Sequence, residues 1–81
     1  MVSTILIGIL VLFQGQPVHN AWIWVSDEIQ TGFYIEQLTD SRGCFIVEVP
    51  PGMHTLTVAK PGFKQFVQDI DTDTVVELIH E

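Results

Sequence analysis

Hydrophobic residues fall along the chain in short runs separated by turn sequences, and they alternate with polar residues most clearly at 43–49 and 53–59, but poorly at 32–39 and 63–69. The runs are rich in Val, Ile, Thr, Phe and Trp, and the turns contain Gly, Pro, Asp or Ser. A period of two with β-branched and aromatic residues predicts strands rather than helices. The pattern places seven strands, at residues 3–13, 20–26, 32–39, 43–49, 53–59, 63–69 and 74–80.

Seven short strands at this spacing predict an all-β protein with two packed antiparallel sheets, an immunoglobulin-like β-sandwich. Alternation within strands predicts which side chains face the interior. Phe45, Val47 and Val49 share one side of their strand, as do Leu56 and Val58 with His54. With 81 residues, the chain is expected to form a single domain over residues 1–81.

The net charge of −7 arises from ten acidic residues against three basic ones, Arg42, Lys60 and Lys64. A surface of this charge repels phosphate, which argues against nucleic acid and anionic membranes as partners. Cys44 is the only cysteine, so no internal disulfide can form, and a free thiol is compatible with the cytosol.

The apolar start of the chain resembles a signal peptide only in part. No Lys or Arg precedes the apolar run, and no small-residue cleavage site follows it. The run from Ile5 to Phe13 is nine residues, well short of the roughly 20 that a membrane-spanning helix needs. We therefore expect synthesis in the cytoplasm without a signal peptide; an exported protein is the alternative.

Residues for catalysis or metal binding are few. Cys44 lies in a tight hairpin beside Phe45, where a buried or half-buried thiol is expected rather than a nucleophile. The three histidines lie on different predicted elements without metal-ligand spacing. Asp69, Asp71 and Asp73 copy the start of a calcium loop, but Gly and Glu are missing at its sixth and twelfth positions, so they make only a weak calcium candidate. No cofactor is predicted.

Motifs along nearly the whole chain resemble those of the carboxypeptidase regulatory-like domain, a transthyretin-like (prealbumin-like) β-sandwich. They are a glycine early in the first strand, a G-x-P-hydrophobic-x-x-A-x-V-x-V segment, a T-D-x-x-G-x-F hairpin, a P-P-G turn with the strand after it, and a P-G-F turn. In this sequence they correspond to Gly8, then Gly15, Pro17, Val18, Ala21, Ile23 and Val25, then Thr39, Asp40, Gly43 and Phe45, then Pro50, Pro51, Gly52, Leu56 and Val58, and finally Pro61, Gly62 and Phe63. Two positions depart from the pattern: His54 replaces a core aromatic residue, and Leu12 replaces a polar one.

The resemblance implies a scaffold whose motif residues shape turns and carry no chemistry. It also implies that Ala21, Ile23 and Val25 point inward, which leaves Trp22 and Trp24 outward. A shifted register, with both indoles in the core, is the alternative.

The first strand is apolar on both faces, and a two-layer sandwich buries only one of them. If the residues around Gly15 make a hairpin, the spare face of this strand would lie beside the two indoles and form one large apolar surface. We therefore predict a partner-binding surface made of Ile5, Ile7, Ile9, Val11, Trp22 and Trp24.

These features favour a non-enzymatic structural or interaction module that docks onto a protein partner or onto copies of itself. An accessory subunit of a larger assembly fits this description, for example a decoration, tail or baseplate protein of a phage virion, by analogy of fold alone. The alternatives are a carbohydrate-binding module that uses Trp22 and Trp24, or an exported cell-surface adhesion domain.

Overall fold

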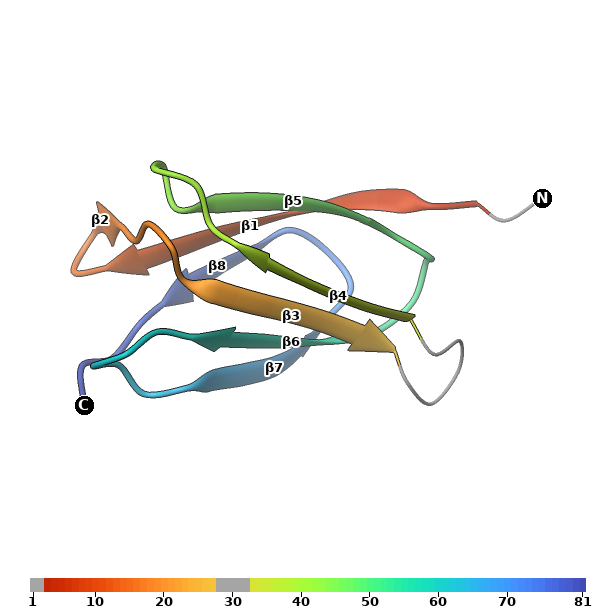
Figure 1. Cartoon of the computed structure of the whole chain (residues 1–81). Coiled ribbons are helices and arrows are strands. Elements are labelled where there is room, and N and C mark those ends of the chain that lie inside the picture. The colour runs from red at the N-terminus through yellow and green to blue at the C-terminus, as the bar shows by residue number, and fades with distance from the viewer. Residues whose placement is uncertain (1–2, 28–32) are drawn as a thin grey trace.

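The computed structural model describes residues 3–27 and 33–81, and this part of the chain contains eight strands and no helix (Figure 1). The all-β prediction is confirmed. The additional strand is a two-residue segment that follows the first strand directly. The strands are β1 (Ile5–Phe13), β2 (Gln16–Pro17), β3 (Trp22–Asp27), β4 (Phe33–Leu38), β5 (Cys44–Val49), β6 (His54–Ala59), β7 (Phe66–Ile70) and β8 (Thr74–Glu77).

Two four-stranded sheets pack face to face and form the predicted sandwich (Figure 1). In the first sheet, β1 pairs with each of β2, β5 and β8. The second sheet has the order β4-β3-β6-β7. All of these pairings are antiparallel except that of β1 with β8, which is parallel. The long strand β1 is therefore the organising strand of the first sheet.

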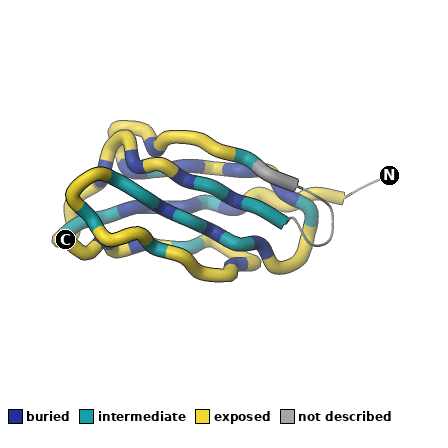
Figure 2. Tube along the Cα trace, turned by 60° about the horizontal axis from the view of Figure 1, so that its bottom comes forward, coloured by how far each residue is buried: buried dark blue, intermediate teal, exposed yellow. Residues whose placement is uncertain are grey.

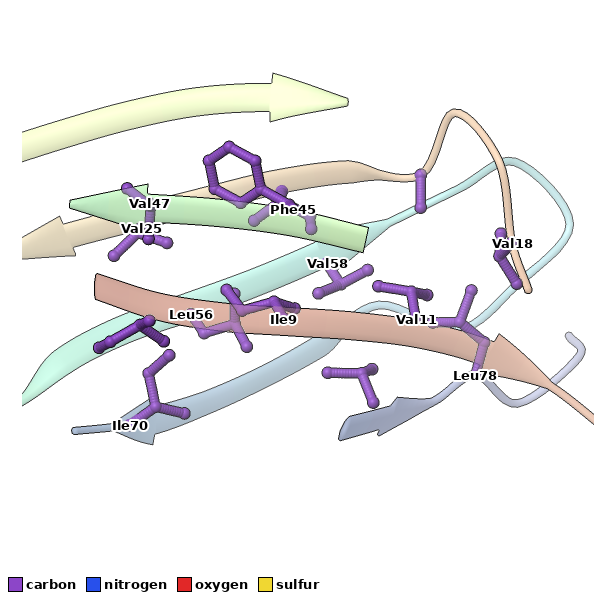
Figure 3. Close-up of a cluster of buried hydrophobic side chains, with 14 of the residues drawn as sticks. Ile9, Val11, Val18, Val25, Phe45, Val47, Leu56, Val58, Ile70 and Leu78 are labelled. Atoms are coloured by element: carbon purple, nitrogen blue, oxygen red, sulfur yellow. The ribbon is translucent and has the colours of Figure 1, made fainter. Parts of the chain in front are cut away.

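The interior is filled by aliphatic side chains from the facing sides of the two sheets, and Phe45 is the one aromatic residue among the buried hydrophobic residues of the described part of the chain. Buried and more exposed residues alternate along the strands (Figure 2). Figure 3 shows side chains of β1 and β5 gathered with those of β3 and β6. The predicted core positions are confirmed by the burial of Phe45, Val47, Val49, His54, Leu56 and Val58.

The predicted facing of β1 is wrong. Ile7, Ile9 and Val11 are buried in the core, whereas Leu6 on the other face is exposed. The pairing with β5 gives the reason, because Ile9 lies opposite Phe45 and Ile7 lies opposite Val47. Directly opposite residues share one face of a sheet.

The remaining member of the predicted isoleucine surface, Ile5, lies opposite the buried Val49 and is 37% exposed, at the start of β1. It belongs to the inner side of the sheet, like the other three. Ile5, Ile7, Ile9 and Val11 therefore do not form an external surface.

The predicted hairpin forms, with Leu12 opposite Pro17, but the chain then leaves the first sheet. Pro17 has no N–H with which to extend the pairing. Asn20 has a φ of 61°, in the left-handed region, and the chain enters the second sheet at Trp22. The outer face of β1 and the two indoles thus lie on opposite outer faces of the sandwich. The prediction of one continuous surface is wrong.

Candidate binding surfaces

The two tryptophans lie on the outer face of the second sheet. Ala21, Ile23 and Val25 are buried, which confirms the outward orientation of the indoles. Trp22 is 49% exposed, and its ring centroid lies 5.7 Å from that of Trp24, with the planes tilted by 43°. The indoles therefore pack partly on each other and leave Trp22 the more accessible of the two.

The neighbours of the indoles are both apolar and polar. Trp22 lies opposite the exposed Leu38 on β4, whereas Trp24 lies opposite Glu36 on β4 and Thr57 on β6. This face thus combines indole surface with groups that can form hydrogen bonds.

The outer face of the first sheet is more strongly apolar. Leu6 is 67%, Ile46 69% and Val75 63% exposed, and they come from the three neighbouring strands β1, β5 and β8. We call this surface the Gly8 face, because Gly8 lies at its centre. It comprises Leu6, Gly8, Leu10, Cys44, Ile46 and Val75.

A hollow of about 310 Å³ lies in the Gly8 face and is open to solvent. Ile46 lies directly opposite Gly8, and Val75 lies opposite Leu10, so larger side chains surround a position that has none. A Cβ at Gly8 would meet nothing closer than Asp73 Oδ1, at 3.7 Å, which is an ordinary contact. The hollow therefore exists because the residue at its floor is glycine, and it has room for a side chain.

Acidic side chains surround this apolar surface. Asp73 lines the hollow, and its Oδ1 accepts a hydrogen bond from the Gly8 N–H at 2.8 Å. Glu48 lies opposite Leu6 on β5, and Glu77 lies opposite Leu12 on β8; both are exposed. None of the three basic residues of the chain lines the hollow.

The turn before β5 fixes this strand against β1. The Asp40 carboxylate accepts hydrogen bonds from the N–H groups of Arg42 and Cys44, at 2.8 and 3.0 Å. These two bonds lower the pKa of Asp40, because they stabilise its charged form. Gly43 has a φ of 75° and lies against the backbone of β1. The Gly43 carbonyl accepts a hydrogen bond from the N–H of Val11 on β1. The turn thus sets the register that brings Ile46 opposite Gly8.

The buried His54 has a structural position at one end of the core. Its Nε2 lies 2.6 Å from the Pro50 carbonyl oxygen, and its Nδ1 lies 3.9 Å from a carboxylate oxygen of Asp27. These contacts place polar partners around a ring that replaces the aromatic side chain expected at this position.

The weak calcium candidate is not assembled. Asp69 accepts a hydrogen bond from the Thr55 hydroxyl in the second sheet, whereas Asp73 binds Gly8 in the first. Within residues 3–27 and 33–81, no group of three or more His, Cys, Asp or Glu side chains could hold a metal ion. The described residues also contain no helix long and apolar enough to cross a membrane. Cys44 is half-buried, as predicted.

The sequence did not indicate Leu6, Ile46 and Val75 as surface residues of a site, and it suggested Asp73 only as a weak calcium candidate. Ile46 is the one large apolar residue on the outward side of its strand, and this alternation was a usable signal. The position of β8 beside β1 depends on a parallel pairing between segments far apart in the sequence, which no local pattern indicates.

Fold and surface together define a small β-sandwich domain with an apolar, acid-rimmed outer face. Residues 6–78 match the family model of the carboxypeptidase regulatory-like domain, and the chain belongs to this family. A domain of this family is not in itself catalytic.

Among solved structures, the chain is similar to a DUF3823 family protein from Parabacteroides merdae. The TM-score is 0.66 at 15% sequence identity, and the match covers 99% of this chain and 47% of that one. The likeness supports the fold, and the chain corresponds to about half of that protein's length. No curated protein sequence matches the chain.

Proposed function

We propose that this domain is a non-enzymatic protein-interaction module that docks through its Gly8 face, as an accessory part of a larger protein assembly. One observation carries the proposal. Leu6, Ile46 and Val75 stay largely exposed around a hollow although the sandwich has a filled core of its own. Contiguous apolar patches on soluble proteins usually mark interaction sites.

The energetics favour a protein over a small ligand at this face. Complete burial of an aliphatic side chain contributes about 1.5–3 kcal/mol, and association costs roughly 4–15 kcal/mol. Burial of the three exposed aliphatic side chains, Leu6, Ile46 and Val75, therefore contributes about as much as association costs and leaves no clear surplus. A stable complex needs additional contact area, or several copies acting together, and a protein surface provides either. A place in a phage virion would be one such setting, and only analogy of fold supports it.

Selection from a random peptide library tests the proposal. Peptides are enriched on the wild-type domain and then measured against Gly8→Val, which fills the hollow with a residue that favours strands. We expect binding to fall at least tenfold for Gly8→Val and to remain for Thr57→Val, a matched change on the outer face of the second sheet. Failure to enrich any peptide, or equal binding by Gly8→Val, would contradict the proposal.

Carbohydrate binding at the tryptophans is a second candidate. The half-exposed Trp22 with Glu36 and Thr57 nearby favours it, because sugars stack on indoles and need polar groups for their hydroxyls. A glycan array should then show binding that Trp22→Ala abolishes and Val67→Ala retains. An array without signal, or a signal that Trp22→Ala leaves intact, would reject this candidate.

A further inference from the structure

We infer that the Gly8 face binds a protein segment in which an aliphatic side chain is flanked by Lys or Arg. This inference rests on the proposed function and adds the chemistry of the partner. An apolar hollow and three carboxylates, those of Asp73, Glu48 and Glu77, lie together on this face.

The floor of the site determines the apolar part of the ligand. Leu10, Ile46 and Val75 surround the space above Gly8, and the volume of about 310 Å³ is at the lower end for small-molecule sites, which span about 300–1,000 Å³. A hollow of this size on an open face takes one or two inserted side chains. The lining is hydrocarbon apart from Asp73, Thr74 and Cys44, so an aliphatic side chain is the complementary one.

The rim determines the charged part. Asp73 is held at the wall of the hollow by its bond from the Gly8 N–H, and this bond fixes the position of the carboxylate before a partner arrives. Glu48 and Glu77 lie towards opposite ends of β1, opposite Leu6 and Leu12. A segment that crosses the face therefore meets negative charge on both sides of the hollow, which favours cationic flanks.

The same charges argue against a second copy of this chain as the occupant. A symmetric dimer through the Gly8 face would bring the acidic rims together, and each chain carries a net charge of −7. Like charges placed opposite each other in an interface are destabilising.

The Asp73 contact also indicates how the partner docks. The Gly8 N–H points to the edge of β1 along which β8 pairs, and β8 begins at Thr74, opposite Ile9. The Asp73 carboxylate thus already accepts the hydrogen bond of the Gly8 N–H, which an added strand would need at this point of the edge. Side chains on the face, rather than a strand added at this part of the edge, are expected to make the contact.

Defined peptides test the inference. The probe is a blocked heptapeptide with two leucines flanked by three lysines, and the matched peptides carry glutamine or glutamate in place of lysine. Binding is followed by amide chemical shifts of the ¹⁵N-labelled domain. We expect the lysine peptide to move the amides of Leu10, Ile46 and Val75, to bind more tightly than the glutamine peptide, and to weaken as salt is raised.

Charge variants complete the test. The triple variant Asp73→Asn, Glu48→Gln, Glu77→Gln keeps an oxygen acceptor for Gly8 and removes the rim charge. Its affinity for the lysine peptide should fall by at least about threefold, as expected for the loss of three exposed ion pairs. The control Glu36→Gln, Asp69→Asn, Glu81→Gln removes the same charge elsewhere and should retain the affinity.

The outcomes separate this inference from the proposed function. Equal binding of the lysine, glutamine and glutamate peptides at the Gly8 face would overturn the inference and leave protein docking at that face standing. An equal loss in both triple variants would also overturn it, because the effect would then come from net charge. If no peptide moves these amides, the inference and the proposed function both fail.

Discussion

The hydroxyl of Thr39 donates a hydrogen bond to the carbonyl of Val18 at 2.6 Å, across the point where the chain passes from one sheet to the other. The same oxygen accepts a bond from the Ala21 N–H at 3.0 Å. Backbone bonds from Asn20 to Thr39 and from Thr39 to Ala21 accompany them. One buried hydroxyl thus satisfies two backbone groups of the crossing and keeps the outer face of β1 on the opposite side from the tryptophans.

Replacement of Thr39 by Val should destabilise the domain without changing the size of the side chain. The variant leaves a buried N–H and a buried carbonyl without these bonds, at a cost of about 1–3 kcal/mol for each unsatisfied group. We expect the free energy of unfolding in urea, followed by tryptophan fluorescence, to fall by about 2–6 kcal/mol. Thr57→Val on an outer face should change it by less than about 0.5 kcal/mol. Equal effects of the two variants would contradict this role of Thr39.

Gly43 and Gly15 allow a test of the close contact between the turn before β5 and β1. Both have a positive φ, 75° and 77°, but a Cβ at Gly43 would lie 2.5 Å from the Val11 carbonyl oxygen, whereas one at Gly15 would meet nothing within 4 Å. Gly15→Ala should therefore cost about 1–2 kcal/mol for backbone strain alone.

Gly43→Ala should cost at least about 2 kcal/mol more, because the contact with β1 cannot form without a shift of the backbone. Thermal unfolding of the two variants measures the difference. Similar losses of stability in both would show that β1 and the turn are not held at this distance.

The core and the turns were predictable from the sequence because their signals are local. Alternation within one strand identified Phe45, Val47 and Val49 as core, and the turn residues bounded the strands. The inward positions on β3 followed from the resemblance to the family.

The facing of β1 was not predictable from its own residues, because both of its sides are apolar. The pairing with β5 determines the facing of β1. Ile9 lies opposite the buried Phe45 and therefore points inward, whereas Gly8 lies opposite the exposed Ile46 on the outer face. The candidate site was missed for the same reason, since Val75 and Asp73 reach it only through the parallel pairing of β8. Long-range pairing, and not local propensity, places the surface.

Asp40 should make stability depend on pH in the acidic range. Its folded-state pKa is lowered by the N–H groups of Cys44 and Arg42, so the charged form stabilises the fold. This contribution is complete above the ordinary carboxyl pKa and is lost as the pH falls through the lower folded value. At pH 7 the wild type should be more stable than Asp40→Asn, and the difference should shrink as the pH is lowered below about 4. A difference that stays constant from pH 7 to pH 2 would contradict the assignment.

Truncation of side chains on the two faces of β1 should have different effects, on stability at the inner face and on peptide binding at the outer face. Ile7 is fully buried and Leu6 is largely exposed, although the two residues are adjacent and similar in size. Ile7→Ala should cost about 2–5 kcal/mol, because it removes core contacts and leaves a cavity. Leu6→Ala should change the free energy of unfolding by no more than about 0.5 kcal/mol, and should instead weaken binding of peptides selected on the Gly8 face. Urea denaturation and peptide titration of both variants measure the two effects separately. The reverse result, with Leu6 needed for stability and Ile7 dispensable, would restore the isoleucine face as the external one and remove the basis for docking at Gly8.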